Sequence, residues 1–85
     1  MTLDNARITK ICLIVKQGIE NLKIATNQAD KMLIIDNTIY YLRNSLGNRY
    51  DDFLKFAFPS YEVVPVILLM ASEELPLKIK EFLEQ

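Results

Sequence analysis

The first 46 residues contain no proline and a single glycine, and their apolar residues recur at alternating steps of three and four. This spacing is typical of one face of an α-helix. The stripe consists of Ile8, Ile11, Val15, Gly18, Leu22, Ala25, Ala29 and Met32. More than half of the 85-residue chain is therefore predicted to be helical, and the predicted fold class is all-α.

The register of the stripe changes near Met32. Continued unchanged, the stripe would place Asp36 and Arg43 in the apolar seam, whereas a second register runs through apolar residues only. That register consists of Met32, Ile35, Ile39, Leu42 and Leu46. A phase change of this kind indicates either one long helix with a local overwind or two separate helices. We favour two helices, at about 4–25 and 28–46, because a single helix would far exceed the usual globular length of about 10–14 residues.

Capping residues mark the predicted helix ends. Asp4, or alternatively Thr2, can accept a hydrogen bond from the unpaired amides at the start of the first helix. Asn27 and Asp30 provide a good start for the second helix. Gly47 follows the last residue of the second register and can adopt a positive φ, which ends the helix there.

Three shorter helices are predicted in the second half of the chain, at about 50–57, 61–72 and 75–84. Pro65 falls inside the middle one, where it should kink the helix or delay its start. The β-branched residues around Pro65 could instead form an edge strand, but no other segment offers a strand for pairing. We therefore expect a small bundle of about four to five helices, forming a single domain over residues 1–85.

Apolar side chains outside the main stripe identify a candidate interaction surface on the predicted 28–46 helix. Leu33 and Tyr40 are seven residues apart, as are Ile34 and Tyr41, so each pair lies on one side of the helix. A helix that is apolar nearly all round must be either central in the fold or covered by an interface. Both alternatives remain open on the sequence.

Aromatic residues are concentrated between positions 50 and 61. Tyr50, Phe53 and Phe56 recur every third residue and fall along one side of a short helix. They either close the core over the preceding helix, because buried aromatic rings dominate core energetics, or anchor a partner helix. The complete candidate interface is Leu33, Ile34, Tyr40, Tyr41, Tyr50, Phe53 and Phe56.

The residue inventory argues against an enzyme. The chain has no histidine, the commonest general base and metal ligand. Its two glycines, 29 residues apart, cannot form a phosphate-binding loop or a dinucleotide fingerprint. The adjacent acidic pairs 51–52 and 73–74 diverge by about 100° on a helix, so neither pair makes a metal site alone. We expect no catalytic residue, no cofactor and no metal.

Composition instead favours a protein partner. Apolar residues make up 51% of the chain, more than so short a chain can easily bury. We expect a non-catalytic interaction module (an adaptor, an inhibitor or a regulatory subunit) whose partner is a second copy or one other protein. The net charge of −1 gives no general attraction to nucleic acid. The mildly basic half, 1–46, nevertheless makes a small nucleic-acid-binding regulator the alternative function.

The single cysteine and the lengths of the apolar runs bear on the cellular compartment. Cys12 excludes an internal disulfide and, lying beside the apolar stripe, is expected to be a buried structural thiol. No apolar run approaches the roughly 20 residues that a membrane-spanning helix needs, and no secretory signal is visible. We therefore expect a cytoplasmic protein.

Overall fold

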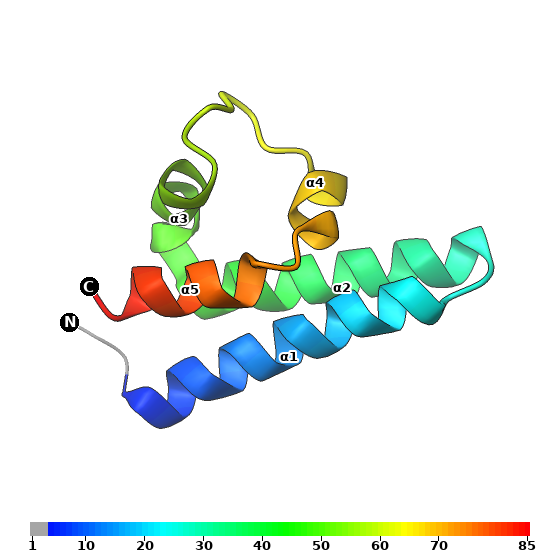
Figure 1. Cartoon of the computed structure of the whole chain (residues 1–85), viewed down its shortest axis with the longest axis horizontal. Coiled ribbons are helices and arrows are strands. Elements are labelled where there is room, and N and C mark those ends of the chain that lie inside the picture. Colours follow the sequence, from blue (N-terminus) through cyan, green and yellow to red (C-terminus); the bar gives the residue numbers. More distant parts are fainter. Residues whose placement is uncertain (1–3) are drawn as a thin grey trace.

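Two long antiparallel helices form the base of the fold (Figure 1). In the computed structural model, which describes residues 4–85, these are α1 (Asn5–Ile24) and α2 (Gln28–Leu46). The chain continues through the 3-10 turn η1 (Gly47–Arg49), α3 (Tyr50–Ala57), α4 (Val66–Ala71) and α5 (Leu75–Leu83). Because the described part of the chain contains no strand, the predicted all-α helical bundle is confirmed.

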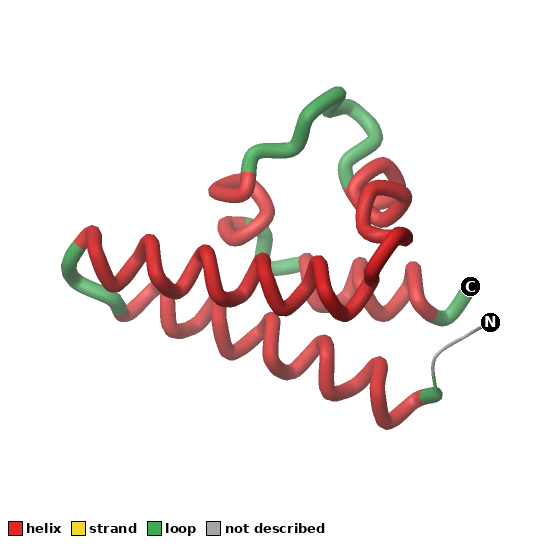
Figure 2. Tube along the Cα trace, turned by 180° about the vertical axis from the view of Figure 1, so that it is seen from behind, coloured by secondary structure: helices red, strands yellow, loops and turns green. Residues whose placement is uncertain are grey.

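The shorter helices cover the α1–α2 hairpin unevenly. α1 packs along α2 on one flank and along α5 on another, whereas α2 meets α3 and α4 only through smaller contacts. Figure 2 shows α2 in front of the other helices, with no described segment lying over it. A loop arches away from the hairpin between α3 and α4 (Figure 1). One side of α2 therefore remains uncovered.

The capping groups at the starts of α1 and α2 are those expected from the sequence. The amide of Arg7 donates a hydrogen bond to Oδ1 of Asp4 (2.9 Å), and the amide of Asp30 donates one to Oδ1 of Asn27 (2.8 Å). Ala25 is extended, with φ −68° and ψ 136°. The chain thus reverses direction at this point, which confirms two helices. Thr2, the alternative first cap, lies outside the described residues.

Gly47 ends α2 with φ 59° and ψ −130°. The positive φ agrees with the sequence prediction, although ψ lies outside the left-handed helical region. In this part of backbone space a residue with a Cβ atom is strained. Gly47 lets the chain leave α2 and enter the 3-10 turn that leads into α3.

Gly47→Val is expected to lower the free energy of unfolding by about 1 kcal/mol or more. The loss comes from the backbone conformation, because a Cβ atom built on Gly47 meets no other atom within 4 Å. Asn48→Val is the matched control, since no described residue other than Gly47 has a positive φ. Equal losses for the two variants in urea denaturation would contradict the assignment.

The predicted 61–72 helix is wrong at its beginning, because α4 starts only at Val66. Pro65 is its N-cap, with φ −64° and ψ 140°. Proline disfavours helical backbone in the residue before it, so Val64 and the residues preceding it remain a loop. Of the two predicted effects of Pro65, a delayed start is the one observed, and residues 66–71 are helix rather than strand.

The core lies between the hairpin and the three short helices. Its members are Ile8, Ile11, Val15, Ile19, Ile39, Leu42, Leu46, Phe53, Ala57, Leu69, Met70, Leu75, Ile79, Phe82 and Leu83. The buried residues of α2 all lie between Thr38 and Leu46, and residues 28–37 include none. α2 is therefore most deeply buried in its second half and is not the central helix that its composition allowed.

Candidate interaction surface on the outer face of α2

Seven residues form the side of α2 that points away from the core, and together they are called the α2 outer face. They are Asp30, Leu33, Ile34, Asn37, Tyr40, Tyr41 and Asn44. Each successive residue of an α-helix turns by about 100°, which places these seven on the side opposite Leu42 and Leu46. None of the seven is buried in the described structure.

The four apolar residues predicted for an interface on this helix differ in exposure. Leu33 is 59% exposed and Tyr40 is 71% exposed. Ile34 and Tyr41 are half-buried and pack against the edge of the core. The α2 outer face thus has two side chains that are free to contact a partner and two that also support the hairpin.

The three aromatic residues of α3 are divided between core and surface. Phe53 is fully buried and meets Phe82 edge-on, with ring centroids 5.5 Å apart. Phe56 contacts the same ring at 5.6 Å but remains 38% exposed. Phe53 therefore belongs to the core rather than to a surface available to a partner, because α5 closes over it. Phe56 lies at the margin of that cluster.

Tyr50 is half-buried and lies beside the α2 outer face rather than on it. Burial raises the pKa of its phenol, while the nearby Arg43 opposes this rise. The Arg43 guanidinium lies 5.7 Å from the centroid of the Tyr50 ring, within cation–π range. Tyr40 and Tyr50 line one shallow depression of about 370 Å³. The structure therefore brings Tyr50 close to the surface residues of α2.

A second shallow depression, of about 390 Å³, lies between α1 and α2. Its lining residues are Arg7, Lys10, Ile11, Tyr41, Asn44 and Ser45. It contains two cationic side chains and no carboxylate, so it favours an acidic group. Because Asn44 lines both depressions, the basic depression borders one end of the α2 outer face.

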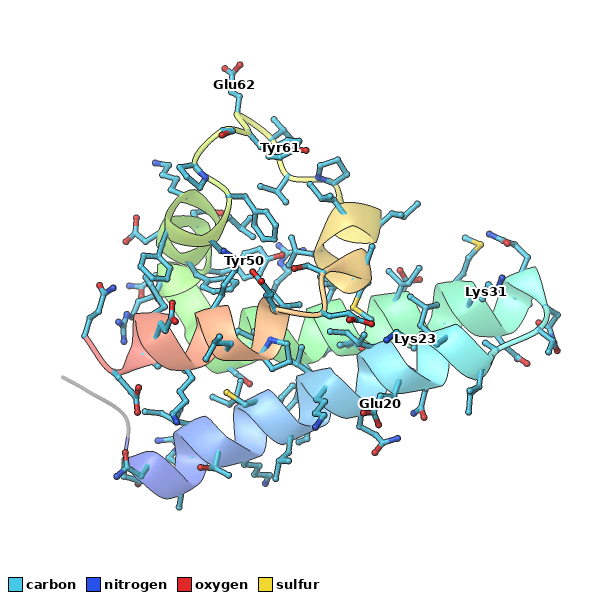
Figure 3. All side chains as sticks on the ribbon, in the orientation of Figure 1. Glu20, Lys23, Lys31, Tyr50, Tyr61 and Glu62 are labelled. Carbon is cyan, nitrogen blue, oxygen red and sulfur yellow. The ribbon has the colours of Figure 1, made fainter. Side chains whose placement is uncertain are left out.

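The other lysines of residues 1–46 lie away from this basic depression. Lys23 forms an ion pair with Glu73, on the α5 side of α1, and that pair is exposed. Lys16 and Glu20 line the same shallow groove as this pair. Figure 3 shows Glu20 and Lys23 along α1 and Lys31 near the end of the hairpin. The basic residues of the described hairpin are therefore dispersed among acidic ones instead of forming one stripe.

Cys12 faces α5 and is half-buried. Its Sγ donates a hydrogen bond to the carbonyl oxygen of Pro76 at 3.4 Å. Burial raises the pKa of the thiol above its ordinary value, although the charge of Lys80 opposes this rise. A raised pKa keeps the thiol protonated and weakly nucleophilic, which agrees with a structural role.

The acidic pairs occupy helix termini and turns. Asp51 and Asp52 lie in the first turn of α3, where their negative charges interact favourably with the positive end of the helix dipole. Among the described residues, no group of three or more histidine, cysteine, aspartate or glutamate side chains is placed to hold a metal ion. Helix electrostatics therefore explains Asp51 and Asp52, whereas Glu73, in the turn before α5, forms an ion pair with Lys23 of α1.

A second group of exposed apolar side chains lies on the arch between α3 and α4 and on the first turn of α4. It consists of Tyr61, Val63, Val66 and Ile67. Figure 3 shows Glu62 at the tip of this arch, with Tyr61 beside it. These residues belong to an irregular segment and to a helix of six residues. They are less regularly spaced than the residues of the α2 outer face.

Comparison with protein-family models, curated proteins and solved structures finds no significant match to this chain. Within residues 4–85, no helix has both the length and the apolar character needed to cross a membrane.

Proposed function

We propose that this chain is a non-catalytic interaction module that binds another protein chain through the α2 outer face. One observation carries the proposal: α2 is a regular helix of 19 residues whose apolar and aromatic outer side is left uncovered. Exposed apolar side chains at helical spacing are a common mode of recognition between helices. Adaptors, inhibitors and regulatory subunits all act by this mode.

Rigidity favours the α2 outer face over the apolar residues of the arch. A recognition site built on a regular helix holds its side chains more precisely than one built on a loop. Tyr41 and Ile34 are also anchored by their contacts with the core. A partner that binds Leu33 and Tyr40 would therefore meet a surface that is already in its binding conformation.

The residue inventory supports a role without catalysis. The chain has no histidine, and its one cysteine is half-buried with a raised pKa. The unpaired thiol also favours a reducing compartment, so we place the module in the cytoplasm. These properties leave contact with another chain as the mode of action.

Leu33→Asp is expected to reduce recovery of the bound protein at least about tenfold, because a charge in the middle of an apolar contact must be desolvated. The measurement is an affinity pull-down of the tagged chain from its native lysate after nuclease treatment. Because Leu33 is exposed, the melting temperature should stay close to that of the parent chain.

Leu77→Asp is the matched control. Leu77 is 56% exposed on α5, so the same substitution alters helix propensity and surface charge at a site away from α2. The proposal requires that Leu77→Asp leave recovery of the partner unchanged. The proposal would be contradicted by equal losses for both variants or by a loss only with Ile67→Asp on α4. It would also be contradicted if the chain captured only nucleic acid when the nuclease is omitted.

A further inference from the structure

We infer that the partner of the α2 outer face is a second copy of this chain, packed antiparallel about a two-fold axis at Asn37. This inference rests on the proposed function and names the occupant of that surface. It is carried by the spacing of the face, by the order of side-chain types along it, and by the opposite charges at its two ends.

The spacing of the α2 outer face is symmetric about Asn37. Its other six residues lie three, four and seven positions before and after Asn37. In a symmetric dimer, residue i of one copy contacts residue j of the other, and j contacts i. In an antiparallel pair, every position of the face would therefore meet a position of the same face on the second copy, and Asn37 would meet Asn37.

The side-chain types on the two sides of Asn37 are complementary. The aliphatic pair, Leu33 and Ile34, precedes Asn37, and the aromatic pair, Tyr40 and Tyr41, follows it. Antiparallel packing places each aliphatic side chain against an aromatic ring of the second copy. The tyrosine hydroxyls can remain at the rim of the contact, where they keep access to water.

The two ends of the α2 outer face carry opposite charge. Asp30 lies at one end. At the other end, Asn44 borders the depression that also contains Arg7 and Lys10. None of these three charged side chains takes part in an ion pair within the described residues. In the antiparallel dimer, Asp30 of each copy would lie against Asn44 of the other and face its basic depression.

The direction of packing follows from the same charges. A parallel pair would place Asp30 next to Asp30 and tyrosines next to tyrosines, leaving both basic depressions without an acidic group. Like charges placed together across an interface are costly, whereas complementary charges fix register and orientation. Antiparallel packing places an acidic side chain, Asp30, against the basic depression of the other copy at both ends of the interface.

The test is a charge exchange measured by sedimentation equilibrium. The parent chain should form a dimer. Asp30→Lys, and separately Arg7→Glu with Lys10→Glu, should each weaken the dimer at least about tenfold by placing like charges together. Combining all three substitutions should restore association. Asp30 lies near the start of α2, so Asp30→Lys also affects the stability of the helix. Restored association in the combined variant would show that the loss in Asp30→Lys comes from charge repulsion between the copies and not from a less stable helix.

Glu81→Lys on α5 is the control, since Glu81 is exposed and lies on another helix. This substitution makes the same change of charge but should leave the dimer unchanged. A monomer at all concentrations, or a dimer indifferent to the charge reversals, would overturn the inference. A monomer that still captures a different protein through Leu33 would overturn the second-copy inference alone and leave the proposed function standing.

The position of the two-fold axis has a separate test. Cys12→Ser first removes the native thiol. In that background Asn37→Cys should form an intermolecular disulfide under mild oxidation, because the introduced thiol would face the same thiol on the second copy. Asn48→Cys, beyond the α2 outer face, should not crosslink. A dimer that resists crosslinking through position 37 would overturn the antiparallel register.

Discussion

Phe53→Ala is expected to lower the free energy of unfolding by about 3–5 kcal/mol, the usual loss for a large aromatic side chain removed from a core. Phe53 is fully buried, and its ring contacts Phe82 of α5 edge-on. Its removal leaves a cavity where α3, α5 and the end of α2 meet. The loss would be a large part of the total stability of an 85-residue domain. Urea denaturation followed by circular dichroism measures it.

Phe56→Ala provides the comparison. Phe56 contacts the same Phe82 ring at a similar distance but is 38% exposed. Part of its surface is already in water, so its truncation should cost less, about 1–2 kcal/mol. A loss for Phe56→Ala equal to that for Phe53→Ala would show that exposure does not separate the two rings.

The contrast between these phenylalanines illustrates what sequence alone could not decide. Both lie on one side of α3 at a spacing of three, and both were included in the candidate interface. Their burial is set by Phe82, near the end of the chain, and by the way α5 packs across α3. Phe82 lies within the predicted 75–84 helix, but its contact with α3 is a tertiary property.

Local chemistry, by contrast, decided the starts of α1 and α2 and the end of α2. Asp4 and Asn27 each accept a hydrogen bond from the amide three residues later, and Gly47 adopts the positive φ that few other residues tolerate. These features involve only neighbouring positions, so sequence reasoning could identify them. Pro65 is the intermediate case, because a proline disfavours helix before it but does not dictate whether the helix kinks or starts late.

The candidate surface was predictable only in part, for the same reason. The pairs formed by Leu33 with Tyr40 and by Ile34 with Tyr41 follow from a spacing of seven. Whether α2 would be covered depended on the position of α5, which packs along α1. The apolar stripe of α1 therefore has two neighbours, whereas the outer side of α2 is contacted only at its edge, through Ile34 and Tyr41.

The core around Phe53 and the proposed binding surface accordingly lie on different sides of the molecule. The cluster of Phe53, Phe56 and Phe82 lies on the side of the hairpin that α3 and α5 cover. Leu33 and Tyr40 lie on the uncovered side of α2. Substitutions in the cluster should alter the free energy of unfolding, and substitutions at Leu33 should alter association. This separation makes the proposed function testable without unfolding the protein.

Gly18→Ala is expected to lower the free energy of unfolding by about 1 kcal/mol net, although alanine is the better helix former. A Cβ atom on Gly18 would lie 2.8 Å from Cγ2 of Thr38 and closer still to its Oγ1. Thr38 is buried, with its Cβ only 3.1 Å from the same point, so α1 and α2 must separate. Overpacking of this kind costs about 1–3 kcal/mol, which exceeds the gain of about 1 kcal/mol in helix propensity.

A double-mutant cycle with Thr38→Ala identifies the contact responsible. Thr38→Ala removes Oγ1 and Cγ2, the two atoms that a methyl group on Gly18 would overlap most. Gly18→Ala should therefore cost much less in the Thr38→Ala background than in the parent chain, with a coupling of about 1 kcal/mol or more. Additive losses would show that the cost of Gly18→Ala arises away from Thr38. Coupling would establish that Gly18 permits the close approach of α1 and α2 at Thr38.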